Sequence, residues 1–133
     1  MLVSLRTVLI FLAFIALIYF PTVIEKWYLD YPWVDIPLHF LGGGWGALLF
    51  FFFFGSLFSE ERGANHPWER VRILILAIAF ASFVGVFWEF GEFILNQYFS
   101  VGMEQSIPDT MGDLFLDILG ALTFGLFLIR RKI

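Results

Sequence analysis

The sequence contains no cysteine, which excludes disulfide bonds and thiolate metal sites. Charged residues make up only 15% of the chain, whereas soluble domains contain about 25%. Basic residues do not cluster with aromatic ones, so nucleic acid is not an expected partner. With only two histidines, the chain also lacks the ligands of a histidine-rich membrane iron site.

Apolar residues are abundant instead: 60% of the chain is hydrophobic and the mean hydropathy is +0.86. About 20 consecutive apolar residues are needed to cross the hydrocarbon core of a bilayer. Four segments meet that length: 3–24, 34–58, 71–98 and 109–129. The sequence therefore predicts an all-α integral membrane protein, with residues 1–133 forming one domain of four transmembrane helices.

Lysine and arginine fall unevenly on the two sides of this topology. Only Lys26 lies on one side, and the other side carries Arg6, Arg62, Arg70, Arg72, Arg130, Arg131 and Lys132. Cytoplasmic loops carry the excess of positive charge. We therefore expect both termini in the cytoplasm, in a multi-pass protein of the cell (inner) membrane.

Small residues recur at intervals of four in three of the segments, at Gly42 and Gly46, at Ala77, Ala81 and Gly85, and at Ala121 and Gly125. Such faces let helices approach closely, so they predict a tight bundle. The run Phe50 to Phe54 is interpreted as a lipid-facing wall. The aromatic residues between the first two segments are typical of an interfacial belt: Trp27, Tyr28, Tyr31 and Trp33.

The last segment opens with Asp109, Asp113 and Asp117. Residues four apart lie on one face of a helix, so these three carboxylates form a ladder. A carboxylate in the hydrocarbon core costs about 2.5–3.5 kcal/mol even on the lenient insertion scale. The ladder therefore has to be compensated by something else in the membrane.

Two other segments carry polar pairs at matching intervals, Asp35 with His39 and Glu89 with Glu92. In the predicted topology all of these groups lie in the outer half of the membrane, and no lysine or arginine accompanies them except Lys26 near the interface. Like charges this close do not all ionise in a low dielectric. Bound cations, protonated carboxyls or a water-filled cavity would each resolve the conflict.

A metal site is the most specific of these alternatives. The candidate ligands are Asp35, His39, Glu89, Glu92, Asp109, Asp113 and Asp117, of which Glu89, Asp113 and His39 are also candidate catalytic residues. Carboxylate oxygens with one imidazole favour Mg²⁺, Mn²⁺ or Ca²⁺ over Zn²⁺. Iron is less expected because di-iron bundles use Glu-x-x-His pairs. The competing interpretation is that protonated or hydrogen-bonded carboxyls hold the helices together.

Three separated motifs resemble a known family. Asp35-x-x-x-His39-Phe40, Glu89-x-x-Glu92 and Asp109-Thr110-x-x-Asp113 with Gly120-Ala121 are similar in order to the YjdF-like inner-membrane proteins. They are more distantly similar to the VanZ-like proteins, which have a comparable helical layout. The resemblance implies an integral membrane protein with an acidic/His site, and it implies no particular reaction.

Three functions stay open at this point. The first is a metal-dependent enzyme acting on a lipid or lipid-linked substrate at the outer leaflet, with two metal ions activating water and holding a phosphoryl group. The second is a cation- or proton-binding transporter or sensor. The third is an accessory subunit of a membrane assembly. Membrane lipids, a second copy of the chain or another membrane protein are the expected partners.

Overall fold

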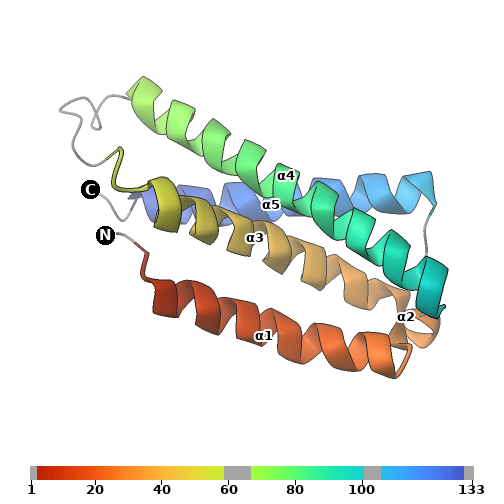
Figure 1. The fold of residues 1–133 in the computed structure, drawn as a ribbon. Coiled ribbons are helices and arrows are strands. Elements are labelled where there is room, and N and C mark those ends of the chain that lie inside the picture. Colours follow the sequence, from red (N-terminus) through yellow and green to blue (C-terminus); the bar gives the residue numbers. More distant parts are fainter. Residues whose placement is uncertain (1–2, 59–66, 101–105, 131–133) are drawn as a thin grey trace.

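The protein is an antiparallel arrangement of four long helices joined by a short helical connector (Figure 1). The computed structural model describes residues 3–58, 67–100 and 106–130. The long helices are α1 (Leu5–Ile24), α3 (Asp35–Phe54), α4 (Pro67–Phe99) and α5 (Ile107–Arg130). The connector holds α2 (Trp27–Asp30) and the 3₁₀ turn η1 (Pro32–Val34). In the described residues, all four long helices have the length and composition to cross a membrane.

The predicted segments correspond to these helices, with shifts at their ends. The second helix ends at Phe54 rather than at residue 58, and the third spans 33 residues from Pro67. At 1.5 Å per residue, α4 is about 50 Å long, well beyond the roughly 30 Å of a hydrocarbon core. Part of α4 therefore extends past the apolar layer or lies tilted within it.

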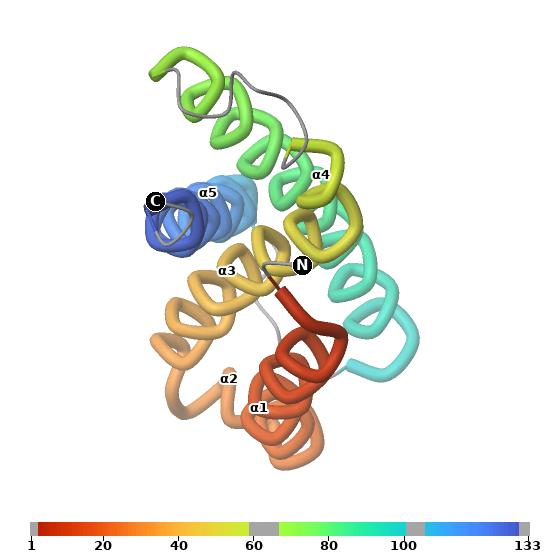
Figure 2. The backbone as a smooth tube through the Cα atoms, turned by 90° about the vertical axis from the view of Figure 1, so that its left-hand side faces the viewer, coloured from red at the N-terminus to blue at the C-terminus, as the bar shows by residue number. Residues whose placement is uncertain are grey.

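Helices α3 and α5 form the most extensive helix pair, and α4 packs across both of them. Helix α1 packs mainly on α3, at the side of the bundle away from α5 (Figure 2). The start of α1 and the end of α5 lie at the same end of the molecule (Figure 1). This arrangement agrees with four crossings, and which side of the membrane that end faces stays a prediction.

Glycine brings α3 and α5 into backbone contact. A Cβ on Gly43 would collide with the backbone of Asp117, and a Cβ on Gly120 would collide with the carbonyl oxygen of Phe40. The predicted small-residue faces also meet, since a Cβ on Gly46 would lie 2.8 Å from the Cβ of Ala81. The α3 glycine whose added Cβ would collide with the α5 backbone is nevertheless Gly43, not the predicted Gly42. A Cβ on Gly42 would make only an ordinary contact, with Asp117 Oδ1 at 3.6 Å.

Two expectations about aromatic residues were wrong. Phe50 and Phe51 are buried in the core, whereas Phe53 and Phe54 are exposed, because five consecutive helical residues point in all directions around the axis. Tyr28 is also buried, at 6% exposure, instead of lying in the interfacial belt. Its neighbours Trp27, Tyr31 and Trp33 are exposed, as a belt requires: they are 40%, 53% and 63% accessible.

Candidate functional site

The imidazole of His39 is the centre of the polar cluster. It is only 2% exposed, and it is positioned by the second turn of α3, whose first turn carries Asp35. Its Nε2 atom has carboxylate oxygens from three helices around it. They lie at 3.5 Å for Asp35 Oδ1, 3.6 Å for Glu89 Oε1, 3.9 Å for Glu92 Oε2 and 4.0 Å for Asp113 Oδ1.

These distances are too long for direct hydrogen bonds. Among the described residues, His39 Nε2, Asp35 Oδ1 and Glu89 Oε1 are buried without any hydrogen-bond partner. Buried polar atoms in native proteins are almost always satisfied. Three unpartnered atoms thus converge on one point between α3 and α4.

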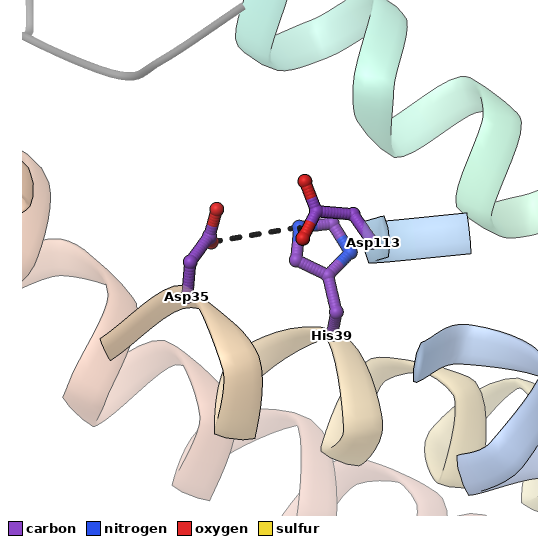
Figure 3. A group of neighbouring side chains, drawn as sticks. All are labelled: Asp35, His39 and Asp113. Carbon is purple, nitrogen blue, oxygen red and sulfur yellow. Dashed lines mark ion pairs between the residues drawn. The ribbon is translucent and has the colours of Figure 1, made fainter. Parts of the chain in front are cut away.

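The spacing matches donor atoms that share one cation. Ligand atoms bound at 2.0–2.6 Å to one ion lie about 3–4 Å from their neighbours in the coordination shell. Two overlapping groups have donor atoms close enough to hold an ion, namely Asp35 with His39 and Asp113, and His39 with Glu89 and Glu92. Figure 3 shows the first group, with the side chains of Asp35 and Asp113 both directed toward the His39 ring. Because His39 belongs to both, the geometry fits a single centre better than two separate ones.

Asp117 lies at the other edge of the same ring. Its Oδ1 is 3.6 Å from His39 Nδ1, one helical turn beyond Asp113 along α5. A carboxylate facing the second nitrogen of a metal-binding histidine commonly fixes the ring orientation and tautomer. The location of Asp117 is therefore that of a residue that orients His39.

Asp109, the outermost member of the ladder, belongs to neither donor group. It is half-buried in the first turn of α5, where its backbone N–H donates to the Ser106 hydroxyl at 3.3 Å. The structure thus brings six of the seven predicted site residues together, with five carboxylates around the imidazole of His39, and leaves Asp109 at the periphery. Ligation itself stays a prediction for all seven.

Aromatic residues complete the site. The indole N–H of Trp88 donates to Glu92 Oε1 at 2.9 Å, which leaves Oε2 as the oxygen that faces His39. The Trp88 ring packs edge-on against Tyr19 of α1, with centroids 4.8 Å apart. Trp88 thus links α1 to the carboxylate cluster. The sequence signal for Trp88 was its position next to Glu89, which made it a candidate wall of the site, with core packing as the more common explanation.

Tyr28 is a residue of the site that the sequence did not indicate. Its hydroxyl is buried without a hydrogen-bond partner among the described residues. Burial raises the pKa of the Tyr28 phenol, and the nearby carboxylates of Glu92 and Asp35 raise it further. Tyr28 therefore presents a neutral hydroxyl from the connector to the same polar cluster.

No positive side chain accompanies the acids. The sequence has no lysine or arginine between Lys26 and Arg62, or between Arg72 and Arg130. A protonated His39 would carry one positive charge against the five carboxylates near its ring. Most of that negative charge therefore has to be neutralised by protons or by a bound cation.

The fold and this cluster define a multi-pass helical membrane protein with a polar site between its helices. Residues 1–132 match the family model described as "Predicted membrane protein (DUF2238)", and the chain belongs to that family. No curated protein and no solved structure matches the chain. The similarities to YjdF-like and VanZ-like proteins stay predictions.

Proposed function

We propose that this protein binds a divalent cation between α3, α4 and α5, and that it acts as a metal-dependent enzyme on a lipid or lipid-linked substrate. One observation carries the proposal: His39 Nε2, buried and unpartnered, faces four carboxylate oxygens at 3.5–4.0 Å. In this proposal the ligands are Asp35, His39, Glu89, Glu92 and Asp113.

The donor chemistry favours a hard cation. Four carboxylates and one imidazole suit Mg²⁺, Mn²⁺ or Ca²⁺, whereas Zn²⁺ usually takes more nitrogen or sulfur. Such an ion, when bound, supplies Lewis-acid polarisation and lowers the pKa of coordinated water. In this proposal Glu89 also accepts a proton during the reaction, through the carboxylate oxygen other than the Oε1 that faces His39 Nε2. Asp117, which faces His39 Nδ1, fixes the orientation of the His39 ring.

The location of the site supports a membrane-embedded substrate. All six residues of the cluster lie near the α2 end of the bundle, toward the expected outer leaflet. In the described spans, the opposite halves of α3, α4 and α5 carry one acidic side chain and no histidine: Glu69, in the first turn of α4, which pairs with Arg72 at that end of the bundle. A continuous polar path across the membrane is therefore not supported, which makes an enzyme a better match than a transporter.

Elemental analysis of the purified protein tests the proposal. The wild type is expected to retain close to one equivalent of divalent metal, and an Asp113→Asn variant is expected to retain much less. Asp30→Asn is the matched control, because Asp30 is exposed on α2. Equal, near-zero metal in all three proteins, after dialysis against micromolar Mg²⁺, Mn²⁺ or Ca²⁺, would refute metal binding.

A transport assay separates the alternative. If the protein moves cations or protons, proteoliposomes should show a flux that depends on Glu89 and Glu92. We expect no such flux above that of empty vesicles. A saturable flux lost in a Glu89→Gln variant would replace the enzyme proposal with a transporter.

A further inference from the structure

A small apolar cavity lies beside the acidic/His site, on the side toward the middle of the bundle. Its volume is about 40 Å³. Its apolar wall comes from α1, α3 and α4 and consists of Leu12, Ile15, Leu38, Trp45, Val84 and Trp88. Its polar end is formed by His39 and Asp117. The cavity therefore has one end suited to a polar group and a remainder suited to hydrocarbon.

The polar end holds an unused acceptor. Asp117 is 3% exposed, and its Oδ2 atom has no hydrogen-bond partner in the described part of the chain. The same oxygen lies against Gly85, where a Cβ would collide with it, and Gly85 itself lines the cavity. The missing side chain at Gly85 thus leaves room for this oxygen at the cavity edge.

Water alone does not match the whole lining of this cavity. A buried water needs two to four polar partners, and cavities lined by apolar side chains stay dry. Here His39 and Asp117 supply two polar partners, which suffice for one water beside them, whereas the apolar remainder of the lining offers none. An occupant that matches the whole lining has a hydrogen-bond donor at one end and hydrocarbon behind it.

The depth of the cavity agrees with the orientation of a lipid. Trp45 lies six residues beyond His39 on α3, which places it about 9 Å farther along the helix axis. That direction leads away from the connector and toward the middle of the membrane. A lipid of the nearer leaflet has its polar group toward the connector and its hydrocarbon chain toward the middle of the membrane.

We propose that this cavity is the subsite for the start of the hydrocarbon chain of a lipid alcohol, whose hydroxyl donates to Asp117 Oδ2. The inference rests on the proposed function and names the substrate class of that site. A single water takes about 10–15 Å³ of such a cavity. The 40 Å³ cavity is therefore large enough for only a short stretch of chain. The rest of the chain runs into the bilayer.

Tryptophan fluorescence provides a direct test. A background protein in which the three exposed tryptophans Trp27, Trp33 and Trp68 are replaced by Phe keeps only the two tryptophans of the cavity wall. This protein, in phosphatidylcholine vesicles with chelator present, is titrated with bromooctanol, whose bromine quenches nearby indoles. Bromooctane, which lacks the hydroxyl, is titrated in parallel.

We expect saturable quenching by bromooctanol and only linear, partition-driven quenching by bromooctane. A Gly42→Val variant adds methyl groups inside the cavity, where a Cβ at position 42 has its nearest neighbour, Asp117 Oδ1, at 3.6 Å. Overfilling of this kind should weaken the saturable quenching at least about tenfold. Gly112→Val is the matched control, because nothing lies within 4 Å of a Cβ there, and its quenching should be unchanged.

Equal quenching by bromooctanol and bromooctane would overturn the inference. An equal bromooctanol concentration for half-maximal quenching in Gly42→Val and Gly112→Val would overturn it as well. The probe comparison needs no cavity variant, so it decides the matter even if Gly42→Val does not fold. Because chelator is present throughout, probe binding is measured independently of metal. A protein that binds bromooctanol but no metal would refute the proposed enzyme and leave the lipid subsite in place.

Discussion

Gly43 provides the sharpest test of how the site is built, because it is where the α3 and α5 backbones touch. Replacing it by Ala places a methyl group within 2.6 Å of both Cα and the carbonyl carbon of Asp117. Ordinary carbon contacts lie at 3.5–4.0 Å, so α5 has to move away from α3 by about 1 Å. That movement separates Asp117 from His39.

The expected loss of stability follows from two opposing terms. Overpacking a well-packed contact costs about 1–3 kcal/mol; because the obstacle here is backbone, which cannot change rotamer, we expect the upper part of that range, about 2–3 kcal/mol. Replacing glycine by alanine in a helix contributes about 1 kcal/mol in the other direction. We therefore expect Gly43→Ala to lower the free energy of unfolding by about 1–2 kcal/mol.

The measurement is reversible unfolding in mixed micelles, followed by circular dichroism as the denaturing detergent is increased. Gly91→Ala is the control, because it makes the same change within α4 and no atom lies within 4 Å of the added Cβ. Gly91→Ala should be neutral or stabilising. If Gly43→Ala is as stable as Gly91→Ala, the close α3–α5 contact does not exist as described.

Three further predictions concern the site. Trp88→Phe removes the hydrogen bond to Glu92 but keeps an aromatic ring, and it should weaken divalent-metal affinity about 10–100-fold in isothermal titration. Trp45→Phe, which loses a hydrogen bond to the Val8 carbonyl, should leave that affinity unchanged; equal losses in both variants would show that the effect is general. Because burial raises the pKa of Tyr28 while an unfolded tyrosine ionises near pH 10, folding stability should fall as pH rises above about 10, and Tyr28→Phe should flatten that part of the stability curve. Chelation should lower the unfolding free energy by about 2.7 kcal/mol relative to protein held at 100 times its metal Kd, with recovery on adding Mg²⁺ or Mn²⁺; a melting temperature indifferent to both treatments would argue against a bound ion.

Much of the fold could be predicted because the membrane imposes strong constraints on the sequence. A span needs about 20 apolar residues, and that requirement alone located all four helices. Helix spacing then predicted which acids share a face, so the convergence of Asp35, His39, Glu89, Glu92 and Asp113 followed from depth and periodicity. Hydrophobic length, depth and helical periodicity can all be obtained from the order of residues along the chain, without knowledge of how the helices pack.

Properties that depend on helix rotation could not be predicted in the same way. Whether Gly42 or Gly43 contacts α5 depends on a rotation of about 100° about the α3 axis, which composition does not determine. For the same reason the sequence did not show that Asp117 faces Nδ1 of His39 whereas Asp113 faces Nε2. Tyr28 was missed because a short connector helix turns it inward, and no periodicity exists in four residues.

The position of Asp113 and Asp117 on α5 has a consequence for how the protein is made. Synthesis proceeds from the N-terminus, so α5 is the last of the four described spans to reach the membrane. On its own it carries aspartates that each disfavour insertion at the helix centre by about 2.5–3.5 kcal/mol, and the histidine that faces them is on α3. Stable insertion of α5 therefore depends on the earlier helices already being in place. The polar cluster thus couples insertion of the last described span to assembly of the bundle.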